Sequence, residues 1–294
     1  MKKIFLSSML TLSMLLTFAI PLSAAPSIQL VINSEVVHSD APPVSVAGRT
    51  MVSLASLKPL KLNLVWNADK KTVTVNAPGV KEKLILTIGK KEASYGEKTL
   101  TLDVPAQLNK NRVVVPLRFI SEAFKAEVEW KADKNTVIIR SADQVETYKK
   151  LYQGTDLVAA RKIAVNLPSK DENTLNNTEE GVYYQYIFPE GEALRYYYVV
   201  GNLYTYYEIK DDVKHLVWEG VEEDDPRQKM KEKGKRPSED NTQYYFLKER
   251  VDNSVTYGKV GAKKPVTQAL PGNASVLADI ILPISGEVRK DQIK

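Results

Sequence analysis

The chain has 294 residues, of which 43% are hydrophobic and 26% are charged, the composition of a globular protein long enough for two domains. It contains no cysteine, which excludes disulfides and lipidated cysteines and leaves stability to packed cores. The formal net charge of +5 is unevenly spread: residues 26–140 hold 17 Lys and Arg against 11 Asp and Glu, whereas residues 141–294 hold 22 against 25. The N-terminal half is therefore the basic one.

The first 25 residues have the three-part pattern of a secretory signal peptide. Lys2 and Lys3 precede the apolar run IFLSSMLTLSMLLTFAI, and PLSAA then offers small residues for cleavage after Ala24 or Ala25. A retained membrane anchor is the alternative, although the apolar run is of borderline length for a span. We favour cleavage. It predicts a mature protein that starts near Pro26, has no membrane span, and is located outside the cell, free or associated with the cell wall.

A repeated motif follows in the basic half. The pattern W-x-A-D-K-x-T-V occurs at Trp66 and again 64 residues later at Trp130. The alignment extends upstream, where RTMVSL at Arg49 matches RVVVPL at Arg112. Each copy predicts an apolar strand, a short helix, a strand with tryptophan, a tight turn and a β-branched strand. Two copies favour a duplicated unit within residues 26–141.

The second copy shows how one unit should pack. Pro116 suits the first turn of a helix, where its missing N–H costs nothing. Leu117, Ile120 and Phe124 then form one apolar helix face. The strand AEVEW alternates so that Trp130 is directed to the apolar side. We therefore predict that Trp130 is buried against this helix.

The segment VVVPLRFISEAFKAEVEWKADKNTVII resembles the copper amine oxidase N-terminal-like domain, also called the stalk domain, and the resemblance covers about residues 28–140. The residues that carry it form a structural signature: Pro116, Arg118, Phe119, Trp66 and Trp130. The resemblance implies antiparallel strands wrapped around a helix, in a secreted or surface protein of a Gram-positive bacterium. It implies no activity, because the module is named after a non-catalytic appendage.

The first copy departs from the signature, with Ser53 in place of the proline and Ala55 in place of the arginine. Arg118 in the second copy has two interpretations. It presents a guanidinium to an anion or partner, or its stem lies on apolar surface while its head bonds a carbonyl or carboxylate of the module. We favour the second.

Amine oxidase chemistry is not expected. It requires copper held by three histidines and a quinone made from a tyrosine that follows asparagine. The chain has only His38 and His215, and no asparagine is followed by tyrosine. No Gly-rich phosphate loop or serine nucleophile motif is present either. We predict no cofactor, no metal and no catalytic residue.

The second half has a different character. Residues 142–168 predict a helical linker of one or two helices, and residues 169–294 predict a tyrosine-rich antiparallel β domain. Of 15 tyrosines, 14 lie after residue 141. The apolar-poor, charge-rich segment 221–241 predicts a mobile loop.

Alternation along three of these strands defines a possible binding face, which consists of Tyr184, Tyr186, Tyr196, Tyr198, Tyr204 and Tyr206. Because tyrosines occupy both faces of the strands, we favour a core role for one face. A platform for a glycan or a protein is the alternative, since exposed aromatic rings serve as anchors.

The predicted fold class is α+β: a duplicated strand and short-helix module, a helical linker and a tyrosine-rich β domain. The leading functional hypothesis is an exported, non-enzymatic binding or structural protein of the cell surface or cell wall. Its expected partner is an anionic envelope polymer or another surface protein, with no role for nucleic acid. The alternative is an exported cell-wall hydrolase with its active site in the C-terminal half.

Overall fold

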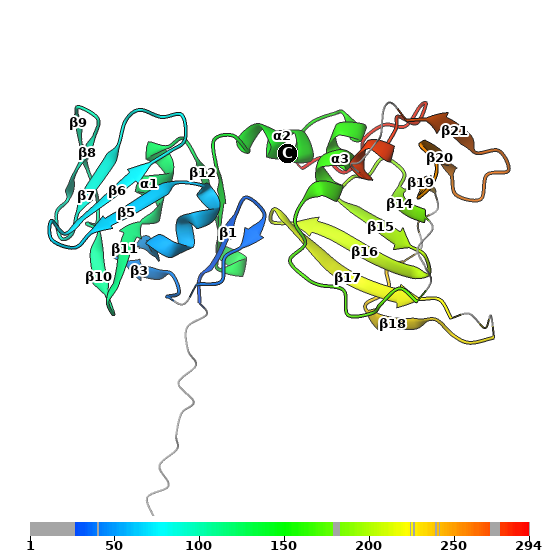
Figure 1. Ribbon diagram of the computed structural model, residues 1–294, viewed down its shortest axis with the longest axis horizontal. Helices are drawn as coiled ribbons and strands as arrows, with labels where there is room; N and C mark the ends of the chain where they lie inside the picture. The colour runs from blue at the N-terminus through cyan, green and yellow to red at the C-terminus, as the bar shows by residue number, and fades with distance from the viewer. Residues whose placement is uncertain are drawn as a thin grey trace, which may run out of the picture.

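The computed structural model describes residues 27–39, 41–178, 183–223, 225, 227–238, 240, 242–270 and 277–293. The predicted signal peptide lies outside these residues. Two lobes stand side by side, an N-terminal domain in blue to green and a C-terminal domain in green to red (Figure 1). In the part of the chain that is described, no helix is long and apolar enough to cross a membrane.

Three small sheets surround the core of the N-terminal domain. Their strand orders are β12–β13–β1–β2, β10–β11–β4–β3 and the meander β5–β6–β7–β8–β9, and the only parallel pair among the described strands is β1 with β13. The strands are β1 Gln29–Ile32, β2 Glu35–Val36, β3 Val44–Val46, β4 Arg49–Ser53, β5 Asn63–Asn67, β6 Thr72–Asn76, β7 Leu84–Thr87, β8 Glu92–Tyr95, β9 Lys98–Thr101, β10 Gln107–Asn109, β11 Arg112–Pro116, β12 Glu127–Lys131 and β13 Thr136–Arg140. The helices are η1 Leu54–Leu60, α1 Leu117–Ala123 and η2 Ala132–Lys134.

Both copies of the tryptophan motif form the predicted hairpin, and they do so in the same register. Trp66 lies opposite Val73 in the pair β5–β6, and Trp130 lies opposite Val137 in the pair β12–β13. The preceding strands β4 and β11 pair with each other, with Val52 opposite Val115. The two copies are therefore interleaved in space. A common origin by duplication stays a prediction.

The helices of the two copies begin differently, as their sequences differ. Pro116 is the N-cap of α1, so the helix begins at Leu117, one residue later than the sequence predicts. The proline makes no side-chain capping bond. In the first copy the hydroxyl of Ser53 accepts a hydrogen bond from the backbone N–H of Ser56. That helix is a 3-10 helix and contains Pro59.

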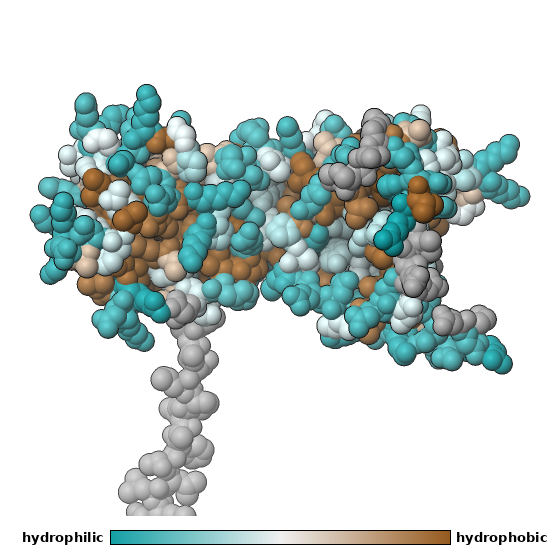
Figure 2. All heavy atoms as spheres, viewed as in Figure 1, coloured by the Kyte–Doolittle hydropathy of each residue, from teal (hydrophilic) through white to brown (hydrophobic). Residues whose placement is uncertain are grey.

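The core of this domain is closed by apolar residues of all three sheets and both longer helices. Leu117 and Ile120 are buried as predicted, and Phe124 packs edge-on against Tyr95 with ring centroids 5.9 Å apart. Figure 2 shows brown, hydrophobic side chains on the face of the N-terminal domain that is turned to the viewer, with hydrophilic side chains around them.

The predicted burial of Trp130 is wrong. Its side chain is 44% exposed, whereas Trp66 in the first copy is partly buried against the core. Trp130 borders an open pocket between β12 and α1, so the helix does not cover its ring.

A stability measurement distinguishes the two positions. Ile120→Ala removes a fully buried side chain and should cost about 2–5 kcal/mol of unfolding free energy. Trp130→Ala should cost clearly less, because nearly half of the indole is already in water. Chemical denaturation of both variants provides the comparison. Equal losses would show that the Trp130 ring is buried after all.

The C-terminal domain is one eight-stranded antiparallel sheet with helices packed on it. Its strand order is β18–β17–β16–β15–β14–β19–β20–β21. The strands are β14 Tyr183–Pro189, β15 Arg195–Val200, β16 Leu203–Lys210, β17 Val213–Val221, β18 Lys231–Gly234, β19 Gln243–Glu249, β20 Ser254–Lys259 and β21 Val266–Ala269. The helices are α2 Val145–Tyr152, α3 Leu157–Asn166 and η3 Leu277–Ile280.

Two sequence expectations change in this domain. The segment 221–241 is not only a loop, because β18 adds to the edge of the sheet beside β17, with Lys233 opposite Glu219. The two predicted helices are present, but they are more than a linker: Tyr148 and Leu151 of α2 and Val165 of α3 belong to the core of the sheet domain.

The tight turn between β16 and β17 contacts the N-terminal domain and holds the two domains together. Asp212 in this turn is buried and accepts two hydrogen bonds from Arg140 at the end of β13, at 2.6 and 3.0 Å. Beside it, Val213 packs on Val31 and Ile138, on the face of the β1–β13 sheet that is turned away from the N-terminal core. The sheet domain therefore docks on the N-terminal domain through both apolar and charged contacts.

Candidate binding pocket

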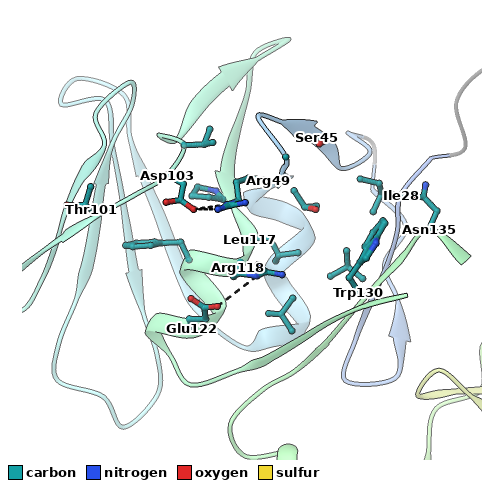
Figure 3. A pocket seen from close by; sticks show the side chains of 17 residues that line it. Ile28, Ser45, Arg49, Thr101, Asp103, Leu117, Arg118, Glu122, Trp130 and Asn135 are labelled. Carbon is teal, nitrogen blue, oxygen red and sulfur yellow. Dashed lines mark hydrogen bonds and ion pairs between the residues drawn. The ribbon is translucent and has the colours of Figure 1, made fainter. Parts of the chain in front are cut away.

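A pocket of about 580 Å³ opens on the N-terminal domain between β12 and α1 (Figure 3). Its walls come from both copies of the repeat, because β3, β4 and β9 contribute side chains as well as α1, β12 and β13. Four of the five signature residues line it: Pro116, Arg118, Phe119 and Trp130. The fifth, Trp66, does not.

One side of the pocket is aromatic and apolar. Trp130 stands there together with Ile28 and Asn135 (Figure 3). Leu117 and Val137, both nearly fully buried, belong to the lining and connect it to the domain core. The Trp130 residue is 44% exposed beside this lining, and its ring gives the pocket a flat apolar surface.

The side opposite Trp130 carries two pairs of opposite charge (Figure 3). Arg49 donates from Nε to the Asp103 carboxylate at 2.7 Å, and one of its terminal nitrogens lies 2.5 Å from the same oxygen. Arg118 Nε lies 3.9 Å from Glu122 Oε1, four residues along α1. All four side chains are substantially exposed, so these pairs add little to stability and stay available to a ligand.

Arg118 thus lies where its head can meet a ligand. Its side chain is 59% exposed, and its carboxylate neighbour Glu122 is held only at long range. The guanidinium is paired with a carboxylate of the module, as the favoured interpretation expects, but the side chain is largely exposed rather than packed. Sequence reasoning also missed Arg49 and Asp103. Arg49 had a weak signal, since it aligns with Arg112 of the second copy, but Asp103 had none.

The six predicted face tyrosines do not form one exposed surface. Tyr186, Tyr196 and Tyr206 are buried, with exposed fractions of 6%, 1% and 0%. Pairing of Tyr196 with Tyr207, and of Tyr197 with Tyr206, places Tyr206 on the opposite sheet face from Tyr196.

Each sheet face uses its tyrosines for packing. On one face Tyr184, Tyr186, Tyr196 and Tyr198 point the same way, and the rings of Tyr186 and Tyr198 stack at 5.0 Å in or beside the core that α2 and α3 cover. On the other face, which also carries Tyr204, the Tyr206 ring lies 4.7 Å from that of Tyr197. The core interpretation therefore describes these residues better than a binding platform.

Titratable groups of the C-terminal domain serve structural contacts. Burial would raise the pKa of the Glu219 carboxyl, but hydrogen bonds from Thr174 and from the backbone of Leu175 outweigh it and hold that pKa below its usual value. Burial lowers the pKa of His215 and, to about 8, that of Lys214. Lys214 donates to the backbone carbonyl of Val165 at 3.1 Å, which anchors the end of α3.

The comparisons with known proteins concern the pocket-bearing domain. Residues 31–139 match the family described as the copper amine oxidase N-terminal domain. This region of the family is not catalytic by itself, and no catalytic domain was matched. No curated protein and no solved structure matches the chain. The matched range includes every lining residue of the pocket except Ile28.

The copper that the family name suggests does not fit the residues present. His38 is exposed just after β2 in the N-terminal domain, and His215 lies on β17 in the other domain. Across the described ranges, no three His, Cys, Asp or Glu side chains are grouped so that they could hold a metal ion.

Proposed function

We propose that this protein is exported and acts as a non-enzymatic binding protein of the bacterial cell envelope, with its N-terminal domain as the binding module. The observation that carries the proposal is the pocket beside α1, where an exposed Trp130 faces two solvent-accessible pairs of opposite charge. Pockets of this size with an aromatic wall and a few polar groups are typical ligand sites.

The composition of the module supports the same proposal. Residues 26–140 carry 17 basic against 11 acidic side chains, so the domain attracts anionic envelope polymers at long range. That attraction is screened beyond about 8 Å at physiological ionic strength, so it guides the approach rather than selecting a ligand. Contacts in the pocket are then needed for selection.

The joint between the domains suggests a role for the C-terminal half. The Arg140–Asp212 pair and the apolar contact around Val213 hold the sheet domain in a fixed position relative to the pocket. We propose that the tyrosine-rich domain is presented at the envelope by the bound N-terminal domain. The full chain, rather than an isolated fragment, is the right material for tests, because a cut at this joint exposes Val31 and Ile138.

Cosedimentation of the full mature chain with purified bacterial cell wall tests the proposal. The protein should sediment with the wall at physiological salt and retain part of its binding at about 0.5 M salt, where charge attraction is largely screened. Protein that stays in the supernatant at every salt concentration would contradict a wall-binding role.

Export has its own test. The positive start, apolar run and small-residue pattern of the first 25 residues predict that the native protein begins near Pro26. N-terminal sequencing of protein recovered outside the cytoplasm should find this start. Recovery of the native protein with Met1 intact inside the cell would refute the prediction.

A further inference from the structure

We propose that the pocket beside α1 is a saccharide site, which takes a neutral pyranose with one ring face against Trp130 and its hydroxyls toward the Arg49–Asp103 and Arg118–Glu122 pairs. The inference rests on the proposed binding function and specifies its ligand. It goes beyond charge attraction, because it assigns selection to ring contact and to paired hydrogen-bonding groups.

The aromatic wall provides the first reason. Sugar rings have an apolar face of C–H groups that loses little when it leaves water, and a flat aromatic ring offers the matching surface. Trp130 is suited to this contact because its indole lines the pocket and is 44% exposed. An exposed indole without a partner is unfavourable in water, so a ligand that covers it gains binding free energy.

The charge balance of the opposite side provides the second reason. The charged side chains among the described lining residues are Arg49, Arg118, Asp103 and Glu122, so their formal charges cancel. A ligand anion placed between them would gain from the guanidinium groups but would be opposed by the carboxylates. A neutral ligand encounters no such conflict.

The hydrogen-bonding capacity provides the third reason. A guanidinium only donates and a carboxylate only accepts, whereas a sugar hydroxyl does both. Each Arg–carboxylate pair therefore matches a hydroxyl that accepts from the arginine and donates to the acid. The hydroxyls of Ser45 and Thr50 lie in the same lining and add further groups of mixed capacity. An aliphatic peptide side chain would use the Trp130 wall but leave these groups without ligand contacts.

The pocket also has the right size and access. Its volume of about 580 Å³ lies within the usual range of about 300–1,000 Å³ for small-ligand sites. The exposed Arg118 and Trp130 side chains form part of its boundary, so a ring within a longer glycan can enter from solvent. The pocket can therefore accept a ring within a short glycan as well as a free monosaccharide.

Isothermal titration calorimetry on the full mature chain tests the assignment, with the neutral probes chitotetraose in its N-acetylated form and cellotetraose, and tetragalacturonate as the anionic probe. At least one neutral probe should bind, and Trp130→Ala should weaken that binding about tenfold or more, equivalent to about 1.4 kcal/mol. Trp130→Phe should retain part of it. Arg118→Gln should weaken it less than Trp130→Ala, because one donor is lost while the ring contact remains.

Matched controls separate the pocket from the rest of the surface. Leu108→Ala changes another exposed apolar side chain of the same domain, outside the pocket, and should leave binding unchanged. Raising the salt from about 0.05 to 0.5 M should change the affinity for the neutral probe less than twofold, since no net charge pairs with the ligand. Circular dichroism should show that each variant is folded.

The outcomes separate this inference from the proposed function. If neither neutral probe binds, or if binding is unaffected by Trp130→Ala, the saccharide assignment is wrong. The same holds if only tetragalacturonate or an apolar peptide binds. Wall cosedimentation of the unmodified protein that persists in such cases leaves the proposed function intact. Conversely, probe binding at Trp130 in a protein that never sediments with wall supports the site and rejects the proposed function.

Discussion

Glu287→Ala should destabilise the protein by about 3–5 kcal/mol, because it leaves a buried arginine without its counter-charge. The Arg161 and Glu287 side chains are 1% and 2% exposed and form a bidentate pair at 2.8 and 2.6 Å. Arg161 also donates to the backbone carbonyls of Glu192 and Pro189 and lies over the Phe188 ring at 4.6 Å. The pair fastens the C-terminal segment to α3 and to the sheet.

Chemical denaturation of the full chain measures this loss, and a nearby pair provides the control. Lys162 on α3 lies 3.6 Å from Asp279, but these side chains are 36% and 51% exposed. Asp279→Ala should therefore cost no more than about 1 kcal/mol. If both variants lost the same small amount, the buried pair would have no special role in holding the C-terminal segment.

A steep loss of stability is expected between pH 10 and pH 12. Burial raises the pKa of Tyr148 and of Tyr198 to about 12 and also raises those of Tyr186 and Tyr196. In the unfolded chain these phenols ionise near pH 10. Above that pH the unfolded state holds fewer protons than the folded state, so the free energy of unfolding falls as pH rises. Each two-unit shift contributes at most about 2.7 kcal/mol.

Denaturation midpoints between pH 7 and pH 12 provide the measurement. Lys214, whose pKa burial lowers to about 8, acts in the opposite direction: its unfolded form keeps a proton up to about pH 10.4, so it adds stability from pH 8 upward until the tyrosines dominate. Tyr198→Phe should lessen the loss at pH 12. Stability that stays flat to pH 12 would mean that the tyrosines are not buried.

Local patterns in the sequence were sufficient for the hairpins and the strand content. The W-x-A-D-K-x-T-V motif, with its turn residues between alternating strands, predicts a hairpin from short-range information alone, and both copies form it. The same motif carried the resemblance to the copper amine oxidase N-terminal-like domain, and the family match over residues 31–139 agrees with it. The strands β14 to β17 likewise follow from tyrosine-rich runs separated by turn residues.

Burial depends on neighbours that are distant in the sequence, and there the predictions failed. Trp66 and Trp130 occupy equivalent hairpin positions on edge strands, but only Trp130 lines this pocket, whose other walls include residues of β3, β4 and β9. Alternation groups the tyrosines correctly within each strand. It does not show whether Tyr196 and Tyr206, on neighbouring strands, lie on the same face of the sheet. The strand register, with Tyr197 opposite Tyr206, determines that.

The pocket itself could not have been predicted from one copy of the repeat. Arg49 is the first residue of β4 and Asp103 follows β9, so the two meet only when segments 54 residues apart in the sequence come together in the fold. The sequence predicted the signature residues as a structural group, and the fold places four of them around a pocket.

The most direct test of the binding role compares cosedimentation of unmodified, Trp130→Ala and Leu108→Ala protein with purified cell wall at about 0.5 M salt, where long-range attraction is screened. We predict that Trp130→Ala remains in the supernatant, while Leu108→Ala sediments like the unmodified protein. Equal sedimentation of the Trp130→Ala variant would show that the envelope is bound elsewhere and would contradict the assignment of the pocket as the binding site.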